Sequence, residues 1–383
     1  MEHVDHVVVG LGALGSATAY QLARRGADVL GLEQFELGHV RGASHDTSRI
    51  IRRAYERPEY VRLADAAYRD WAEFEEVSGE HLVTRTGGVT FCPPTAPAPL
   101  ADYLHSLRVC GVEHEELDAA AMRELVPQFA VPEGVGAVWT ADSGIVHANR
   151  SVAALQMHAR MFGARLRDRC PVTSLQEDAD GVVLQTAQGP VHAGLVVLCT
   201  DAWTNRLLAP LGAQVPMRVM QEQVTYFKPD RPAEFEIGRF PIWIWEDQVC
   251  YYGFPCFGEP TIKAARDVSE VLMGTDERTF VPSPTRFDEL RAFMATTLPG
   301  SGVPLRTVTC QYALTPDRHF VLDSVPGHPR LHLGLGAGHA FKFTPTMGRV
   351  LADLATTGSS TEDLSLFRAD RPALRDPMPV GAA

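Results

Sequence analysis

Apolar residues follow two different spacings in the first part of the chain. Residues 7–9 form a continuous β-branched run, which is typical of a strand buried on both faces. From 13 to 25 the apolar positions fall on one broad face at helical spacing, and Gly26 follows as a left-handed helix end. A second apolar run over 29–32 completes a predicted unit of strand, helix and strand, from which parallel sheets are built.

The rest of the chain continues to alternate between these spacings. Short strands and helices are expected over 86–149, a buried parallel strand over 195–198, and an alternating, aromatic-rich sheet over 218–305. The order predicts an α/β protein of two domains, a Rossmann-like domain and a second domain built on a mixed or antiparallel sheet. The expected division is 1–85, 150–217 and 306–383 for the first domain, and 86–149 and 218–305 for the second.

Three glycines stand where the first predicted strand meets the first helix. Gly10, Gly12 and Gly15 match the pattern G-x-G-x-x-G. The first permits a tight turn, the second lets a pyrophosphate approach the backbone, and the third lets the helix pack closely on the strand. Glu33, at the end of the second strand, is placed to accept hydrogen bonds from an adenosine ribose. The unit predicts a dinucleotide site and leaves NAD and FAD open.

A polar loop after Glu33 leads into residues 46–53. The sequence predicts a helix here, capped by Asp46, Thr47 or Ser48, with Arg49 and Arg52 on one helix face. A loop after the second strand of a dinucleotide fold commonly lies against the cofactor, so we expect these residues near the site.

Composition narrows the function classes. The 383 residues exceed the usual size of a single core, and the formal charge of −12 argues against nucleic acid as a partner. No apolar run is long enough to span a membrane, and no leader precedes the first strand, so a cytoplasmic enzyme is expected. The seven cysteines include no C-x-x-C pair, so neither a disulfide framework nor a metal site is expected.

Lysine is rare in this chain. Lys228, Lys263 and Lys342 are the three lysines among 35 basic residues. One interpretation is that lysine remains at these three positions by chance. The other is that some of these positions need a compact ammonium whose pKa shifts readily, which arginine cannot supply.

Several segments along the chain resemble the monomeric sarcosine oxidase and N-methyltryptophan oxidase family of FAD-dependent amine oxidases, within the D-amino-acid-oxidase-like superfamily. The resemblance extends over nearly the whole chain. Besides the glycine motif it rests on His45, Arg49–Arg52, Arg85–Val89, Asp142–Gly144, Ala202–Asn205, Tyr251–Pro255, Lys263, Cys310–Tyr312 and Gly338–Phe343.

The resemblance implies a role for each of these positions. Arg52 and Lys342 would hold the substrate carboxylate, and Lys263 would lie near the flavin and activate O₂. Cys310 would attach FAD covalently through a thioether, while the residues alone leave open that it is an ordinary buried cysteine. His45 and Arg49 would lie on the opposite flavin face. His339, Tyr252 and Tyr312 would line the substrate side, although a hydrogen-bonded core histidine remains an alternative. The implied cofactor contacts are Gly10, Gly12, Ala13, Leu14, Gly15, Glu33, Gln34, Ser44, His45, Arg49, Val172, Trp203, Cys310, Gly338, His339 and Lys342.

Four positions depart from the family pattern. Where the family has Ser-His-His-Gly-Asp-Thr-Arg, this chain has Ser-His-Asp-Thr-Ser-Arg, which includes Asp46. Asp201 replaces the family glycine before Ala-Trp. Asp267 stands where sarcosine oxidases have a histidine, and Ala340 replaces a glycine. The Asp46 and Ala340 changes crowd places where the backbone meets cofactor or substrate, so a substrate other than sarcosine is expected.

The sequence therefore predicts an FAD-dependent oxidase of a secondary or cyclic α-amino acid. It would move a hydride equivalent from the C–H bond beside the amine to flavin, and O₂ would then give hydrogen peroxide. Its partners would be a small amino acid and O₂, with no nucleic acid or membrane, and it would be a monomer. The alternatives are a flavin dehydrogenase with another electron acceptor and, from a different class, an NAD-dependent dehydrogenase.

Overall fold

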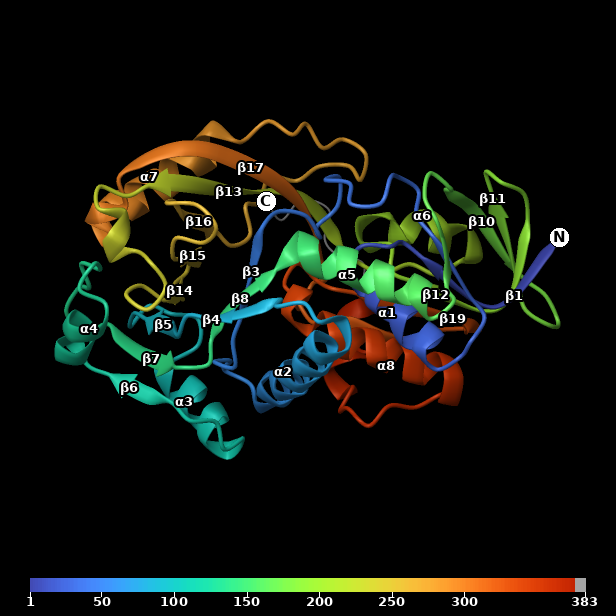
Figure 1. Ribbon diagram of the computed structural model, residues 1–383, viewed down its shortest axis with the longest axis horizontal. Coiled ribbons are helices and arrows are strands. Elements are labelled where there is room, and N and C mark those ends of the chain that lie inside the picture. The colour runs from blue at the N-terminus through green and yellow to red at the C-terminus, as the bar shows by residue number, and fades with distance from the viewer. Residues whose placement is uncertain (376–383) are drawn as a thin grey trace.

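The computed structural model describes residues 1–375 of the chain. Figure 1 shows an elongated molecule with one large sheet toward each end, and the long strands β13 and β17 reach from one end toward the middle. The predicted α/β class is confirmed.

The N-terminal unit forms the centre of the first sheet. β1 pairs in parallel with β2 on one side and with β12 on the other. The path runs β10-β11-β12-β1-β2-β9, with β19 beside β12 and β18 beside β19. The strands are β1 (Glu2–Val9), β2 (Val29–Leu32), β9 (Arg165–Arg167), β10 (Val172–Glu177), β11 (Val182–Thr186), β12 (Val191–Leu198), β18 (Val321–Val325) and β19 (His328–Leu335).

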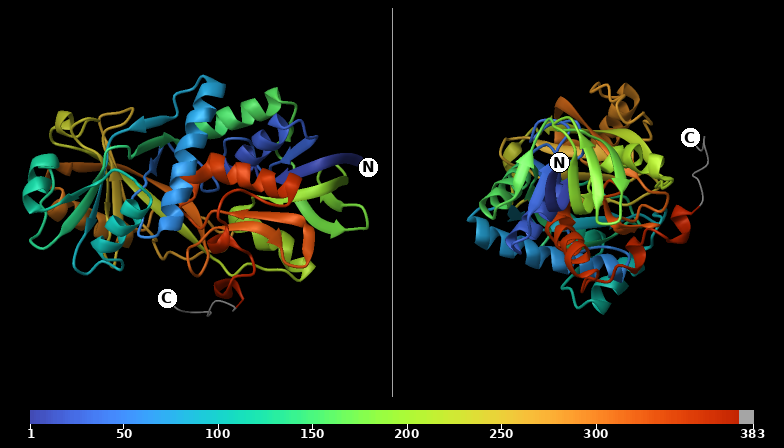
Figure 2. Two further views of the ribbon diagram at one scale, coloured as in Figure 1. Left: turned by 90° about the horizontal axis from the view of Figure 1, so that it is seen from below. Right: turned by 90° about the vertical axis from the view of Figure 1, so that its right-hand side faces the viewer.

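Helices cover one face of this sheet. The predicted first helix is confirmed as α1 (Ala13–Arg24), and Gly26 follows it with φ of +80°. α5 (Ala148–Met161) and α8 (Thr344–Thr357) pack against α1, and α2 (Pro58–Ser78) crosses α8, as Figure 2 shows. Within residues 1–375, no helix is both long and apolar enough to cross a membrane.

The second sheet has mixed strand directions. Its order is β17-β13-β16-β15-β14-β5-β7-β6, antiparallel except for the pairing of β14 with β5. Its strands are β5 (Gly88–Cys92), β6 (Glu115–Leu117), β7 (Gly136–Thr140), β13 (Arg218–Lys228), β14 (Ile242–Trp245), β15 (Tyr251–Phe254), β16 (Ile262–Arg266) and β17 (Val303–Leu314). Helices α3 (Leu100–Val109), α4 (Ala119–Leu125) and α7 (Pro284–Thr297) lie at the same end of the molecule as this sheet (Figure 1).

The membership of the two sheets supports the proposed domain division. Strands from three separate parts of the chain form the first sheet, and the intervening parts supply most of the second. The proposed boundary at residue 306 falls within β17, which pairs with β13 along nearly its whole length. The boundaries remain a proposal.

The predicted helix after Asp46 is wrong. Ser48–Ile51 is a strand, β3, in a small sheet with β8 (Gly144–His147) and β4 (Val83–Arg85). Arg49 lies in this strand and Arg52 follows its end, so the two arginines do not share the face of a helix. The polar residues that resembled helix caps bond elsewhere: Asp46 and Thr47 both contact the hydroxyl of Tyr226.

The close approach of α1 and α8 depends on a residue without a side chain. A Cβ placed on Gly348 would lie 2.5 Å from the Cβ of Ala17 and 2.7 Å from its carbonyl carbon. We expect Gly348→Ala to lower the free energy of unfolding by about 1–3 kcal/mol, because the overlap outweighs the gain in helix propensity. Chemical denaturation measures the effect. In the control Gly300→Ala, the nearest atom to the added carbon lies 3.4 Å away, so little change is expected. Equal stabilities of the two variants would contradict this packing.

Candidate active site

One large cavity lies between the carboxyl end of the first sheet and the second sheet. Its volume of about 1300 Å³ exceeds the roughly 300–1,000 Å³ of an ordinary ligand pocket. All the residues that the resemblance implies at the site line it, except Gly15. The cavity is therefore large enough for a dinucleotide together with a small substrate.

The glycine segment forms one end of the cavity. Gly10 has φ of +90°, and a Cβ there would lie 2.5 Å from the carbonyl oxygen of Cys199. Gly15 lies beneath it, because a Cβ at that position would overlap the carbonyl oxygen of Gly10. The backbone is therefore bare where β1 enters α1, and the positive end of the helix faces the cavity.

Glu33 is held in place by the backbone around this end. Its Oε2 accepts a hydrogen bond from Leu11 N at 2.8 Å, and its Oε1 accepts one from Phe35 N at 3.0 Å. Burial raises the pKa of Glu33, but the hydrogen bonds from His39 and from these amides outweigh it, so the net pKa is lowered. An ionised carboxylate beside a bare helix N-terminus fits the ribose and pyrophosphate of a dinucleotide.

Other residues predicted to contact the cofactor also lie around this end of the cavity. Ser44 Oγ accepts a hydrogen bond from Ala13 N at 3.0 Å, and so caps α1 from a distant loop. Trp203 lines the cavity, but its indole N–H donates to Asp276 at 2.9 Å. Leu14, Gln34, Val172 and Gly338 also line the cavity.

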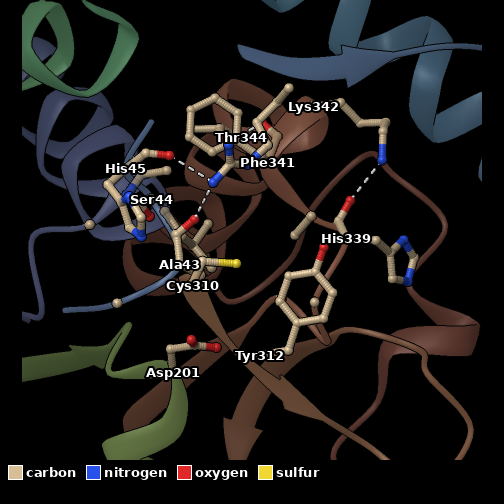
Figure 3. Close-up of a pocket in the computed structure, with 18 of the residues that line it drawn as sticks. Ala43, Ser44, His45, Asp201, Cys310, Tyr312, His339, Phe341, Lys342 and Thr344 are labelled. Carbon is tan, nitrogen blue, oxygen red and sulfur yellow. Dashed lines mark hydrogen bonds between the residues drawn. The ribbon is translucent and has the colours of Figure 1, made fainter. Parts of the chain in front are cut away.

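The middle of the cavity is formed by a loop and a strand. The Arg49 guanidinium donates to the carbonyls of Ser48, Ala43 and His45 at 2.7–2.9 Å, which fixes the loop. His45 Nε2 is buried without a hydrogen-bond partner among the described residues. Burial, assisted by Arg49, lowers the pKa of His45 to about 4, so the ring is neutral at pH 7. Cys310, on β17, lies on the same side of the cavity in Figure 3.

Lys263 lies on β16 and forms a buried ion pair. Its Nζ donates to Asp46 Oδ2 and to the Ser48 carbonyl, both at 3.0 Å, and the Tyr226 hydroxyl donates to Asp46 Oδ1 at 2.7 Å. Burial lowers the pKa of Lys263 to about 8, although Asp46 acts in the opposite direction. Burial opposes ionisation of Asp46 too, but Lys263 and Tyr226 outweigh it and lower the pKa of Asp46 to about 2.

Two cations converge at the far end of the cavity. Arg52 contacts Glu246 at 3.4 Å and lies over the ring of Tyr55, while its Nη1 is buried without a partner among the described residues. Lys342 Nζ donates to the His339 carbonyl at 2.8 Å. Within residues 1–375 no carboxylate lies at ion-pair distance from Lys342, so this end of the cavity can accept an anion. Burial, followed by repulsion from Arg52, lowers the pKa of Lys342 to about 7.

Neutral side chains complete this end. Burial holds the pKa of His339 well below its usual value, and His339 Nε2 contacts the Arg318 carbonyl at 2.9 Å. A carbonyl only accepts, so this nitrogen carries the ring proton. Burial likewise raises the pKa of Tyr252 and Tyr312, which therefore keep their protons. In Figure 3, His339, Tyr312 and Lys342 lie on the side of the cavity away from His45.

The structure adds residues that the sequence analysis missed. Glu246 contacts Arg52, the Arg318 carbonyl contacts His339, and Tyr226 contacts Asp46, the partner of Lys263. None of the three is adjacent in sequence to the residue it contacts, so no local pattern marks them. Asp46, by contrast, was already marked in the sequence as a departure from the family pattern. It has φ of +80°, which suits the glycine of the family pattern, and its carboxylate is the partner of Lys263.

Comparison with known proteins gives consistent matches over nearly the whole chain. Residues 5–354 match the model of the FAD dependent oxidoreductase family. A monomeric sarcosine oxidase from Streptomyces avermitilis is 36% identical over 95% of this chain and 96% of its own length. An N-methyl-L-tryptophan oxidase from Escherichia coli is 30% identical over 96% and 99%. Among solved structures, NikD, described as an unusual amino acid oxidase essential for nikkomycin biosynthesis, superimposes with a TM-score of 0.85 at 29% identity over 96% of this chain and 98% of its own.

The buried ion pair predicts a pH-dependent change in stability. Asparagine tolerates φ of +80° as aspartate does, so Asp46→Asn removes the charge without new backbone strain. We expect a loss of about 3 kcal/mol in the free energy of unfolding at pH 6.5, because the Lys263 ammonium is left buried and unpaired. The folded-state pKa of this lysine lies below its unfolded value and falls further in the variant. The loss is therefore present at low pH and fades as pH rises through about 8, where Lys263 loses its proton in the unsubstituted protein.

Chemical denaturation at pH 6.5 and pH 9 measures this difference. Asp288→Asn is the matched control, because Asp288 belongs to an exposed ion pair with Arg291. A loss below about 1 kcal/mol is expected for the control at both pH values. A loss for Asp46→Asn that is the same at both pH values would show that Lys263 titration plays no part.

Proposed function

The chain belongs to the family of FAD-dependent oxidoreductases, in the group that includes monomeric sarcosine oxidase and N-methyltryptophan oxidase, and we propose that it oxidises a secondary or cyclic α-amino acid at the carbon beside the amine. One observation carries the proposal. One cavity joins a dinucleotide cradle at one end to Arg52 and Lys342 at the other, where, within residues 1–375, Arg52 Nη1 has no hydrogen-bond partner and Lys342 has no carboxylate beside it. The relatives are named as oxidases of sarcosine and of N-methyl-L-tryptophan, both N-methyl amino acids, and these names support this substrate class.

The residues present fit FAD better than they fit a small ligand alone. The bare backbone at Gly10, the ionised Glu33 and the unpartnered His45 Nε2 follow one another along the cavity. FAD, when bound, supplies a two-electron acceptor for the C–H bond beside the amine and a route for those electrons to O₂.

Arg52 and Lys342 would fix the substrate carboxylate. The planar guanidinium offers two parallel N–H donors to a carboxylate, and Lys342 adds a point charge. An anion between them would also offset the repulsion that lowers the pKa of Lys342. Fixing the carboxylate would orient the adjacent C–H bond and amine, which is where much of the rate gain of such a site arises.

None of the neutral side chains around the substrate end would act as a strong base. His339 is neutral and its Nε2 contacts a backbone carbonyl, and Tyr252 and Tyr312 keep their protons. The substrate amine would therefore have to lose its proton before the C–H bond breaks, and positioning rather than proton abstraction from carbon would be the contribution of the protein.

Lys263 would serve the electron transfer to O₂. The first electron makes superoxide, and a fixed cation in a region of low dielectric stabilises that anion without reorganisation. Lys263 is 3% exposed, Asp46 and the Ser48 carbonyl fix its ammonium, and the Phe254 ring centre lies 4.4 Å away, so the charge is held in place and shielded from water. The rival proposal is a dehydrogenase that passes electrons to a quinone or protein carrier, and peroxide formation under air separates the two.

Cys310 would carry FAD as a thioether, and the protein would act as a monomer. Cys310 lines the cavity as a free thiol beside the Arg49 loop. Burial raises the pKa of this thiol to about 12, against a smaller opposite effect of Arg49. Attachment would therefore need a group that accepts the thiol proton. The word monomeric in the names of the sarcosine oxidase relatives supports the oligomeric state.

Substitution of the lysines tests the proposed oxygen site. We expect Lys263→Met to slow reoxidation of the reduced flavin by O₂ at least about a hundredfold, the effect typical of losing one preorganised electrostatic contact, with a much smaller effect on reduction by substrate. Stopped-flow absorbance measures the two half-reactions separately. Lys228→Met is the matched control, because Lys228 is exposed and lies outside the cavity. Equal losses in both half-reactions would contradict the role of Lys263.

Acid precipitation tests the covalent bond. We expect the yellow colour to stay in the pellet for the unsubstituted protein and for Cys256→Ala, whose cysteine does not line the cavity. In Cys310→Ala the pellet should be colourless and the supernatant yellow. Free flavin released from the unsubstituted protein would refute the thioether.

A further inference from the structure

A third cation lies at the substrate end of the cavity. Arg318 Nη2 donates to Asp267 Oδ2 at 2.8 Å. Its Nε is buried without a hydrogen-bond partner among the described residues, yet the side chain as a whole is 42% exposed and lines the cavity. A guanidinium that binds a carboxylate through one N–H leaves donors for another acceptor, and an unmet buried donor costs about 1–3 kcal/mol.

The backbone holds Arg318 firmly. Its φ is +58°, and its N–H donates to the Thr315 carbonyl at 3.1 Å in a tight turn. Asp317, in the same turn, forms a double ion pair with Arg371. The backbone of Asp267 is fixed as well, because its N–H donates to the Cys250 carbonyl at 2.8 Å. Both members of the pair therefore stand on fixed backbone, as a recognition site requires.

Two hydrogen bonds connect Arg318 to the proposed carboxylate clamp. The Arg318 carbonyl contacts His339 Nε2 at 2.9 Å, and the His339 carbonyl accepts from Lys342 Nζ at 2.8 Å. Arg318 and Lys342 thus both contact His339, Arg318 through its main-chain carbonyl and Lys342 through its ammonium. The charge of Arg318 helps to lower the pKa of Lys342, and Asp267 raises it, so all three groups share one electrostatic environment.

The charges at this end do not balance. Arg52, Arg318 and protonated Lys342 supply three positive charges, and Glu246 and Asp267 supply two negative ones; Glu56 and Arg57, which also line the cavity, offset each other, and Asp317 is paired with Arg371. A zwitterionic amino acid with one carboxylate carries no net charge and would leave the excess in place. An amino acid with a second carboxylate carries one net negative charge and would remove it.

We infer that Arg318, positioned by Asp267, binds a second carboxylate at the distal end of the substrate, so that the substrate is an N-substituted or cyclic amino dicarboxylate. This inference rests on the proposed function, because it takes the Arg52 and Lys342 pair as the site of the first carboxylate. Arg318 is a specificity-determining residue in this arrangement and has no part in breaking the C–H bond.

Binding of two unreactive acids to the FAD-loaded protein tests the inference. Acetate carries one carboxylate and succinate two, and the change that each causes in the visible flavin spectrum gives a dissociation constant. We expect Arg318→Met to weaken succinate binding about tenfold or more and acetate binding less than twofold, because only succinate reaches both cationic groups. Arg231→Met, which alters an exposed ion pair with Glu234, should change neither.

Two further variants guard against a purely structural effect. Arg318→Lys keeps the charge but loses the Nε donor, so part of the succinate affinity should return. Asp267→Asn keeps a side chain of similar shape and leaves Arg318 unpaired, so succinate should bind at least as tightly as before. Equal weakening of both acids by Arg318→Met would place Arg318 in the first carboxylate clamp, and no weakening of either would remove it from recognition; both results overturn the inference.

A substrate comparison separates this inference from the proposed function. Anaerobic bleaching of the flavin by N-methyl-L-aspartate should require a lower concentration than bleaching by sarcosine, and Arg318→Met should abolish the difference. If sarcosine bleaches the flavin and N-methyl-L-aspartate has no advantage, the inference fails while the proposed function stands. If no amino acid of either kind bleaches the flavin, the proposed function fails.

Discussion

The cost of burying positive charge governs the arrangement of the cavity. Eight lysines and arginines of the described residues line it, and the five at the centre and the substrate end are stabilised to different degrees; these five are Arg49, Arg52, Lys263, Arg318 and Lys342. Arg49 is surrounded by three backbone carbonyls, whereas Lys263 has a full ion pair with a carboxylate. An isolated charge in such a place would cost several kcal/mol, so the loops and strands that carry the partners must come together for the fold to be stable. The same requirement ties the two sheets to each other around the site.

The incomplete neutralisation at one end has chemical consequences. Lys263 is paired with Asp46 and holds its proton near neutral pH, but burial and repulsion from Arg52 lower the pKa of Lys342 to about 7, and no carboxylate of residues 1–375 lies at ion-pair distance from it. The first arrangement suits a fixed charge that acts on a small neutral molecule. The second suits an anionic ligand, which would raise the pKa of Lys342 on binding. The two lysines therefore serve different purposes although both are buried.

The sequence predicted those parts of the fold that local patterns encode. A β-branched run, a glycine turn and an amphipathic helix specify β1 and α1 without reference to the rest of the chain, and the predicted helix ended where the structure ends it. The strand at Ser48–Ile51 could not be predicted, because Asp46 is fixed by Lys263 and Tyr226 from the second sheet rather than by a helix N-terminus. The family resemblance identified the residues that line the cavity, but Asp46, Glu246 and Asp267 are far along the chain from the cations they pair with, so the pairings became evident only in three dimensions.

Two of the departures from the family pattern share a physical basis. Asp201 replaces a family glycine, Asp46 lies in a segment whose family counterpart contains a glycine, and both have positive φ, at +45° and +80° respectively. Aspartate is among the few residues other than glycine that tolerate this region, so the change adds a carboxylate without rebuilding the backbone. Their environments differ. Asp46 meets a lysine and is ionised, whereas Asp201 Oδ2 has no partner among the described residues and burial raises its pKa to about 7. Aspartate at positive φ is thus a counter-ion at one position and, at the other, a carboxyl group that burial keeps partly protonated near neutral pH.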